Sequence, residues 1–247
     1  MNKRIVGIFC GLLAVVMLVV LCCVIFVVGS VSVQTTAELE LSSEMNAKIL
    51  QDSNIVKYSS IFGISEEKAK ENIEKNNPML KVVLIERKFP NKVVINVATR
   101  VEMLAIAMEN GKFAILDREL KILEIVDALD SKKILSRVEN FVIPQDAQVG
   151  TFVENASWLK KVILGAERIS FLNQRFAVFF PKVEYQEKKI ILHTNSGVKF
   201  VINSANSDDI STLISYAYSF FTEKAMDKNS GYIVLQDKGW TWLPKIS

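Results

Sequence analysis

The chain has 247 residues, a formal net charge of +3 and one histidine. Its 30 basic and 27 acidic residues are mixed along the sequence without a long block of one sign, so nucleic-acid binding has no electrostatic basis. The length suffices for two modest domains, and 50% of the residues are hydrophobic, in part because one segment is almost purely apolar.

This apolar segment lies at the N-terminus, where no charged residue occurs between Arg4 and Glu38. Residues 5–28 would span roughly 36 Å as a helix, which is enough for the hydrocarbon core of a bilayer. We therefore expect a single transmembrane helix there. Because Lys3 and Arg4 precede it, the positive-inside rule keeps residues 1–4 in the cytoplasm and exports the remainder of the chain.

Two other interpretations of the segment stay open. A cleaved signal peptide would use residues 30–32 as its small-residue site, although the apolar core exceeds the usual signal length. Lipidation at Cys22 would require a smaller residue than Leu21 before it. Cys10 and Cys23 also lie in the segment, so the exported part has no cysteine and is predicted to depend on packed cores rather than disulfides.

Residues 65–100 show the clearest local pattern, that of a helix, a strand, a turn and a second strand. Ser65 can accept hydrogen bonds from the first turn of a helix, and Pro78 biases Asn77 away from helical angles, so the helix is predicted between them. The β-branched runs on either side of residues 89–92 alternate as strands do. We expect an antiparallel hairpin with the helix on its apolar face.

The two faces of this helix are also predicted. Ala69 and Ile73 mark the buried face. On the exposed face, Glu66 stands four residues before Lys70, a spacing that favours an ion pair within the helix.

A set of residues at the helix end, in the two strands and in the turn makes up a recognisable pattern. They are Ile73, Asn76, Asn77, Pro78, Val83, Ile85, Arg87, Phe89, Pro90, Asn91, Ile95, Val97 and Arg100. With this pattern the segment resembles the POTRA module of the bacterial division proteins FtsQ and DivIB. The resemblance implies a βααββ domain over residues 31–100, with a first strand in residues 33–41 and a first helix over residues 43–50. Thr99 departs from the family pattern, which usually has Glu there.

Residues 101–247 have the pattern of a second domain, mainly of antiparallel strands with two covering helices, so the fold class is α+β. Asn110-Gly111 is a strong hairpin signal. Apolar spacing predicts one helix over residues 157–169 and another that starts at Ser207 or Asp208 and runs to Phe221. The predicted strands are 104–108, 112–116, 120–125, 139–144, 182–186, 190–194, 198–203 and 232–235.

Residues that could carry chemistry are scarce. His193 stands in a predicted strand without partners for a metal site or proton relay, and is expected to be an ordinary strand residue. Asp208 and Asp209 are adjacent at a helix start, where carboxylates serve the cap and the dipole. No nucleophile elbow or phosphate loop appears where the fold would support it. We expect no catalytic residue, metal or cofactor, and interpret the chain as a binding protein rather than an enzyme.

The candidate binding site lies at the C-terminus. An exposed strand can be extended by a partner segment through backbone hydrogen bonds. The hypothesis places this site at the edge formed by Tyr232, Ile233, Val234 and Leu235, with Trp240 and Trp242 in a polar tail as aromatic anchors. The alternative left open is that this strand belongs to the core and the tryptophans cover it.

The family resemblance implies a function at the division septum. It implies a single-pass membrane protein that scaffolds septal peptidoglycan synthesis and binds FtsL-like and FtsB/DivIC-like partners, with the septal synthase complex as a further candidate partner. Two alternatives are a POTRA-bearing chaperone of envelope assembly or secretion, and a membrane-tethered envelope enzyme or sensor. The first would need repeated modules or a barrel, and the second lacks a catalytic set.

Overall fold

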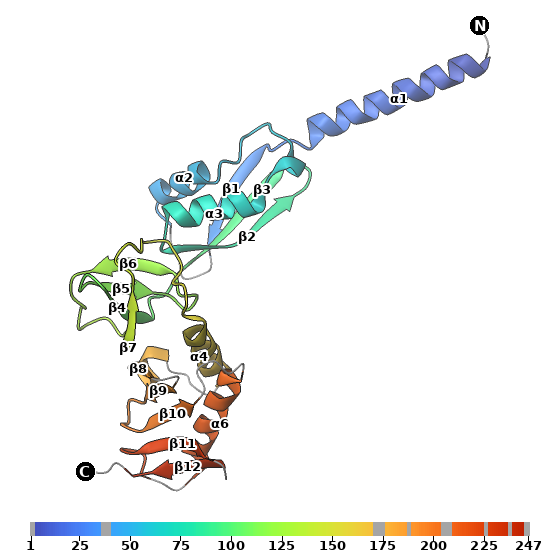
Figure 1. Ribbon diagram of the computed structural model, residues 1–247. Helices are drawn as coiled ribbons and strands as arrows, with labels where there is room; N and C mark the ends of the chain where they lie inside the picture. The colour runs from blue at the N-terminus through green and yellow to red at the C-terminus, as the bar shows by residue number, and fades with distance from the viewer. Residues whose placement is uncertain are drawn as a thin grey trace. The chain divides into compact units, whose positions relative to one another are not determined.

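The computed structural model describes residues 3–35, 41–169, 176–186, 189–203, 209–224, 227–236 and 239–244, with the side chains of residues 3–10, 22 and 23 excepted. The chain divides into two compact units, Met1–Arg100 and Val101–Ser247 (Figure 1). Each unit is described by itself below. Residues 1 and 2 of the predicted cytoplasmic segment, and Ser207 and Asp208 of the predicted helix cap, lie outside the described residues.

The first unit begins with helix α1 (Lys3–Ile25). Among the described residues, the structure contains no helix with the length and apolarity needed to cross a membrane. The transmembrane helix over residues 5–28 therefore stays a prediction. Its C-terminal limit is too late, because Val27 forms an isolated bridge with Ser60 and Val28 is fully buried in the core of the domain that follows. An apolar run has the same appearance whether it faces lipid or a protein core.

The rest of the first unit has the predicted order of strand, two helices and two strands. Its elements are β1 (Ser30–Thr35), α2 (Ser43–Asp52), the short 3-10 helix η1 (Ile61–Gly63), α3 (Glu66–Asn76), β2 (Leu80–Lys88) and β3 (Lys92–Thr99). The sheet order is β1-β3-β2, with β1 parallel and β2 antiparallel to β3. Helices α2 and α3 lie on one face of this sheet (Figure 1). The βααββ prediction is confirmed.

Helix α3 forms where its local signals predicted it. The Ser65 hydroxyl accepts a hydrogen bond from the Lys68 N–H at 3.4 Å, and Ala69 and Ile73 are buried against the sheet. Glu66 makes an ion pair with Arg87, with 2.9 Å between Oε1 and Nη2, which joins the start of the helix to strand β2.

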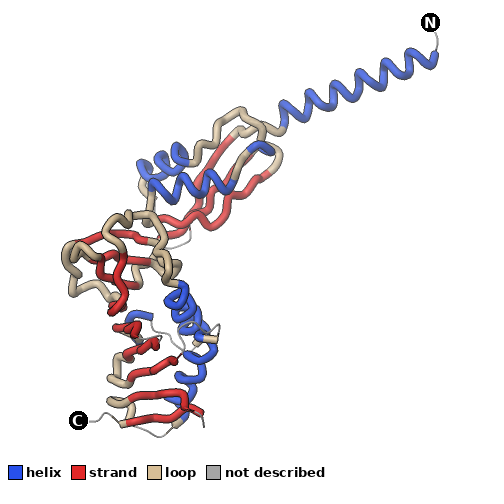
Figure 2. Tube along the Cα trace, viewed as in Figure 1, coloured by secondary structure: helices blue, strands red, loops and turns tan. Residues whose placement is uncertain are grey.

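The second unit contains one large sheet, helices and connecting loops (Figure 2). Its strands are β4 (Leu104–Met108), β5 (Phe113–Leu116), β6 (Ile122–Val126), β7 (Ser136–Ile143), β8 (Lys182–Gln186), β9 (Lys189–His193), β10 (Lys199–Asn203), β11 (Tyr232–Gln236) and β12 (Gly239–Leu243). Its helices are α4 (Ser157–Arg168), α5 (Phe176–Phe179) and α6 (Ile210–Glu223). The sheet has nine strands in the order β12-β11-β10-β9-β8-β7-β4-β5-β6.

The predicted hairpin and meander of this unit are confirmed. Strands β4 and β5 pair antiparallel across the turn at Asn110 and Gly111, and strands β8, β9 and β10 follow one another as antiparallel neighbours. Three further pairings are parallel, namely β4 with β7, β7 with β8, and β10 with β11. The sheet is therefore mainly antiparallel, as expected, but its order depends on long-range parallel contacts.

The core of the second unit lies between the sheet and helices α4 and α6. Phe180, Phe200, Leu159 and Ile214 are fully buried in it. The two helices approach closely at Gly165, where an added Cβ would lie 2.8 Å from the Ser211 Cα. Helix α6 packs on β10 and β11, and so holds the C-terminal part of the sheet in place.

Candidate partner-binding edge

Residues 232–235, which were predicted to form an edge strand, lie inside the sheet. Strand β11 pairs in parallel with β10 on one side and antiparallel with β12 on the other. The prediction that residues 232–235 form the free edge is therefore wrong. The outer strand is β12, which contains the two tryptophans that were expected in a polar tail.

The tryptophans of β12 pack against the core of the unit. Ile233 is fully buried and stands opposite Trp242, and Leu235 stands opposite Trp240. Both indole rings are half-buried and contact the core, and the Trp242 Nε1–H donates a hydrogen bond to the Ser230 carbonyl at 3.1 Å. Trp240 and Trp242 therefore attach β12 to the core, which is the alternative that the sequence left open.

A glycine makes this attachment possible. Gly231 has a φ of 102°, in the left-handed region that favours glycine. A Cβ at this position would lie 2.6 Å from the Leu243 carbonyl oxygen. The close approach of β12 to the start of β11 therefore requires a residue without a side chain.

The opposite side of β11 and β12 is more accessible. Tyr232 stands opposite Leu243, and Val234 stands opposite Thr241. All four side chains are partly or fully exposed, and Leu243 is 38% exposed. The Lys199 Nζ lies 5.4 Å from the centre of the Tyr232 ring, a cation–π contact that holds the ring over strand β10.

Strand β12 is one of the two outermost strands of the nine-stranded sheet, and β6 is the other. Within the described residues, no strand pairs with β12 on the side away from β11. An edge strand leaves backbone N–H and C=O groups free to pair with an added strand. Thr241 and Leu243, which sequence reasoning missed, are the side chains that such a strand would meet on the accessible face. The alternation of residues 239–243 was the signal that could have identified this strand.

A charged cluster occupies the helix-free face of neighbouring strands. Lys182 Nζ lies 2.7 Å from Glu139 Oε2 and 2.7 Å from Glu184 Oε1. His193 Nε2 lies 2.8 Å from the same Glu184 oxygen. The hydrogen bonds to Glu139 and Glu184 raise the pKa of Lys182 above its ordinary value. This arrangement joins strands β7, β8 and β9.

The acid and the histidine of this cluster have shifted pKa values. Burial acts to raise the pKa of Glu184, but the Lys182 hydrogen bond and the neighbouring positive charges hold it below its ordinary value. Burial lowers the pKa of His193, with the charges of Lys199 and Lys182 adding to that effect against the attraction of Glu184. Near neutral pH His193 is therefore uncharged beside an ionised Glu184.

Residues of the POTRA pattern have structural partners within the first unit. Arg100 is 5% exposed, and its Nη2 lies 2.7 Å from Glu74 Oε2. The other Glu74 oxygen accepts a hydrogen bond from the Val82 N–H at 3.0 Å, and the Arg100 Nε–H donates to the Leu80 carbonyl at 3.2 Å. This buried ion pair connects α3, β2 and the end of β3.

The remaining residues of the pattern shape the helix end and the hairpin. Asn77 precedes Pro78, and its side-chain amide donates to the Ile73 carbonyl at 2.9 Å, which closes the last turn of α3. Arg87 donates to the Ile64 carbonyl at 2.9 Å. The turn residues Phe89, Pro90 and Asn91 connect β2 to β3, with a cis peptide bond before the proline. These residues build the module, and none lies on β12.

The aspartate at the start of α6 and the single histidine lie on different elements. Asp209 is the N-cap residue of α6 and makes no side-chain capping hydrogen bond, while Asp208 lies outside the described residues. His193 belongs to strand β9 and contacts Glu184, as described above. In the described part of the chain, no three or more His, Cys, Asp or Glu side chains are grouped to hold a metal ion.

Comparison with known proteins adds two findings. The family model of the POTRA domain, FtsQ-type, matches residues 42–100, which correspond to the part of the first unit from α2 to the end of β3. The chain is also similar to the cell division protein DivIB of Clostridium tetani, with 25% identity over 195 residues that cover 77% of this chain and 71% of that protein. The similarity to DivIB therefore extends beyond the POTRA match.

Proposed function

We infer that this chain, which belongs to the FtsQ/DivIB family of bacterial cell division proteins, acts as a scaffold of the division machinery. Its task is to bind other division proteins rather than to catalyse a reaction. The similarity to a cell division protein over 77% of the chain carries this inference. The free outer side of β12 supplies a physical means of binding.

The proposed partners are FtsL-like and FtsB/DivIC-like single-pass division proteins. One extended segment of such a partner adds to the outer side of β12, where backbone hydrogen bonds provide affinity and alternate side chains fix the register. On the accessible face, Leu243 and Thr241 contact the side chains of the added segment. Trp240 and Trp242 act indirectly, since they hold β12 against the core.

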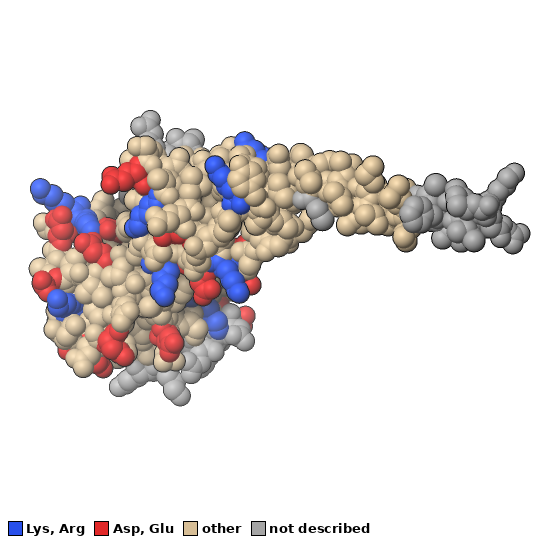
Figure 3. Space-filling view, turned by 90° about the horizontal axis from the view of Figure 1, so that it is seen from above, with Lys and Arg blue, Asp and Glu red and all other residues tan. Residues whose placement is uncertain are grey.

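The proposed localisation is the cell membrane at the division septum. Residues 5–28 contain no charged residue, and the described apolar side chains of α1, such as Leu12, Val16 and Leu18, are exposed. The part of α1 that is coloured tan in Figure 3 shows no charged side chain, whereas acidic and basic side chains are interspersed elsewhere on that face. We propose that residues 5–25 of α1 form a single membrane anchor, with the N-terminus in the cytoplasm.

Binding measurements on edge variants test the proposed site. In the full chain, Leu243→Arg and Thr241→Arg each add a charge at the accessible side of β12, where an added segment would place its side chains. We expect at least about a tenfold loss of affinity for the exported segments of the partners, equivalent to 1.4 kcal/mol or more. Val142→Arg is a matched control, because Val142 is 52% exposed in strand β7 of the same unit.

The proposed site is wrong if Leu243→Arg and Val142→Arg bind the partners equally well. Cross-linking gives a second test that does not depend on stability, since a photoreactive residue at position 243 should capture the partner and one at position 142 should not. Midcell recruitment of a fluorescent fusion, and filamentation after depletion, test the division role itself. Uniform envelope staining with normal septa would instead favour an envelope chaperone or sensor.

A further inference from the structure

Three phenylalanines meet at one end of the first unit. The ring centres of Phe26 and Phe62 are 5.5 Å apart, those of Phe26 and Phe89 are 6.0 Å apart, and those of Phe62 and Phe89 are 5.5 Å apart. We call these residues the aromatic cluster. Phe62 is 59% exposed and Phe89 is 56% exposed, so two of the three rings remain largely in water although they touch one another.

Backbone hydrogen bonds fix the segments that carry these rings. The Phe26 carbonyl accepts from the Ile61 N–H at 3.0 Å, which ties the residue after α1 to the residue before Phe62. The Asn91 carbonyl accepts from the Gly29 N–H at 2.7 Å, which ties the turn between β2 and β3 to the same place. The aromatic cluster is therefore held by the fold, and large rings fixed together in water indicate an interaction surface.

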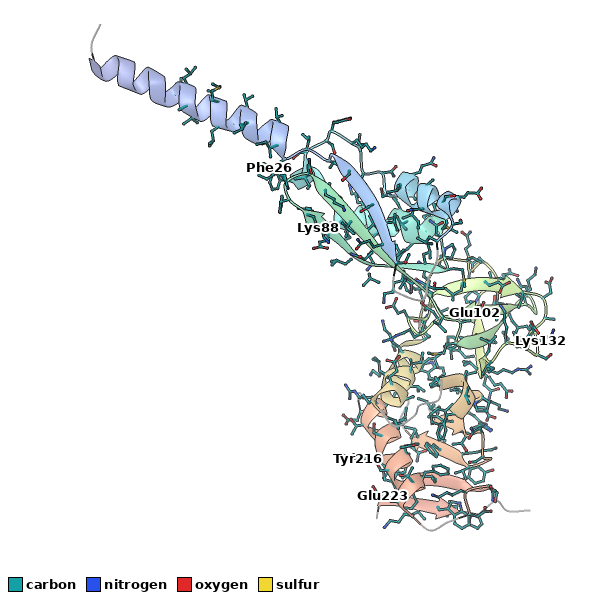
Figure 4. The ribbon with its side chains drawn as sticks, turned by 180° about the vertical axis from the view of Figure 1, so that it is seen from behind. Phe26, Lys88, Glu102, Lys132, Tyr216 and Glu223 are labelled. Atoms are coloured by element: carbon teal, nitrogen blue, oxygen red, sulfur yellow. The ribbon has the colours of Figure 1, made fainter. Side chains whose placement is uncertain are left out.

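Three basic residues lie on the segments that carry Phe62 and Phe89. Lys88 and Lys92 flank the turn that contains Phe89 and pair with each other in the strand register, and Lys57 lies on the loop that leads to Phe62. All three lysines are exposed. Lys88 makes a long 3.4 Å contact with the exposed Glu86, which screens its charge weakly. Figure 4 labels Phe26 where α1 meets the domain and Lys88 on the hairpin.

We propose that the aromatic cluster rests in the headgroup region of the membrane, with the three lysines against anionic lipid phosphates. Phe26 directly follows Ile25, the last residue of α1, so the cluster begins where the proposed anchor ends. Phenylalanine side chains of interfacial segments insert at the boundary between headgroups and acyl chains, and basic side chains next to them are attracted to anionic lipids. The inference rests on the proposed anchor and adds that the first unit docks on the bilayer rather than hanging from a free tether.

Spin labels in the full chain test this docking. Cys10, Cys22 and Cys23 are replaced by Ala, and a nitroxide is attached at Phe62→Cys, at Glu71→Cys on the exposed face of α3, or at Val16→Cys in α1. The proteins are reconstituted in vesicles of phosphatidylcholine with phosphatidylglycerol. We expect the label at position 62 to collide several-fold less with a water-soluble nickel complex than the label at 71, and the label at 16 to collide mainly with oxygen.

The proposed attraction between the lysines and anionic lipid is tested in the same vesicles. Lys88→Glu with Lys92→Glu should bring nickel accessibility at position 62 close to the value at position 71. Lys75→Glu, an exposed residue in the last turn of α3, should leave it unchanged. Vesicles of phosphatidylcholine alone should reproduce the effect of the double variant. An equal response to the double variant and to Lys75→Glu would overturn the role of the lysines.

The outcomes separate the docking from the proposed anchor. If the label at 16 is shielded and the label at 62 is as accessible to nickel as the label at 71, the docking is overturned and the anchor stands. If the label at 16 is itself open to nickel, the anchor fails and the docking fails with it. Spin–spin broadening at position 62 that disappears on dilution with unlabelled chain would show that a second copy, not lipid, covers the cluster.

Discussion

The two units both place helices on one face of a sheet, but they close their cores with different chemistry. In the first unit a buried ion pair, Arg100 with Glu74, connects the helix to the strands. In the second unit phenylalanine rings fill the corresponding space, with the centres of Phe180 and Phe200 5.7 Å apart and those of Phe200 and Phe221 also 5.7 Å apart. A buried charge therefore depends on its matched partner, whereas a buried ring depends on the volume that it fills.

The largest expected effect is the loss of a central ring in the second unit. Phe200→Ala removes a side chain with no exposed surface that contacts Phe179, Phe180 and Phe221. Because a cavity adds to the lost burial, we expect the free energy of unfolding to fall by about 3–5 kcal/mol. All three tryptophans belong to this unit, so denaturant unfolding followed by tryptophan fluorescence measures its stability.

Tyr216→Ala is the control for that measurement. Tyr216 is 59% exposed on α6, where Figure 4 labels it, and its replacement should change the free energy of unfolding by no more than about 0.5 kcal/mol. Similar losses for the two variants would mean that the ring cluster around Phe200 does not determine the stability of the unit.

The ion pair of the first unit gives the next largest effect. Arg100→Met removes the guanidinium that pairs with the buried Glu74 carboxylate, and loss of one member of a buried ion pair typically costs about 3–5 kcal/mol, reduced here to the extent that other contacts of Glu74, such as the hydrogen bond from the Val82 N–H, remain. Because the first unit has no tryptophan, its stability is measured by hydrogen exchange of the β2 and β3 amides in the full chain.

A double variant separates the contribution of the two charges from that of the volume that the Arg100 and Glu74 side chains fill. Arg100→Met combined with Glu74→Leu removes both charges, and apolar replacements of a buried pair are often neutral or stabilising. We therefore expect the double variant to regain most of the protection lost in Arg100→Met. A double variant as unprotected as the single one would show that the hydrogen bonds to Val82 and Leu80, rather than charge matching, stabilise the unit.

A smaller effect is expected where α4 crosses α6. At Gly165 an added Cβ would lie 2.8 Å from the Ser211 Cα and 3.1 Å from the Ser211 carbonyl oxygen, so the backbone of α6 must shift. Gly165→Ala should destabilise the second unit by about 1–3 kcal/mol in thermal unfolding. Gly63→Ala in the first unit is the matched control, because its Cβ would meet no atom closer than 4.0 Å. Equal melting temperatures for the two variants would contradict the close crossing.

The elements with local signals were predictable in both units. Ser65 and Asn77 mark the two ends of α3 through hydrogen bonds within a few residues, and Asn110-Gly111 marks the turn between β4 and β5. These signals are local because the atoms that make the contacts are neighbours in the sequence. The same reasoning identified β8, which has the predicted bounds Lys182–Gln186.

Long-range pairing was not predictable in the same way. Strand β7 lies between β4 and β8 through parallel pairings, and β10 is joined to β11 only after the chain has passed through α6. Local alternation gives no information on such neighbours. From local signals alone, residues 239–243 look like a tail and β11 looks like the edge strand, although Trp240 and Trp242 alternate with Thr241 as in a strand. Glu74, the partner of Arg100, likewise lies 26 residues away and carries no local sign of burial.

The smallest expected effect on stability comes from His193, on the helix-free face of the second unit. Burial lowers the pKa of His193 below its ordinary value of 6.5. The unfolded chain therefore takes up this proton at a higher pH than the folded chain. Stability from this residue is present above about pH 6.5 and is lost as the pH falls toward the folded pKa. Glu184, whose pKa is lowered from 4.5, adds a further loss only below about pH 4.5.

His193→Gln should accordingly flatten the fall in unfolding free energy just below pH 6.5, while the loss below pH 4.5 remains. The measurement is a series of denaturant unfolding curves by tryptophan fluorescence from pH 7.5 to 4 on the full chain. Lys189→Gln changes an exposed residue of the same strand β9 and should leave the slope as it is. A slope that survives in His193→Gln would assign the acid sensitivity to carboxylates instead. The contact of His193 with Glu184 would then be neutral to stability over this range.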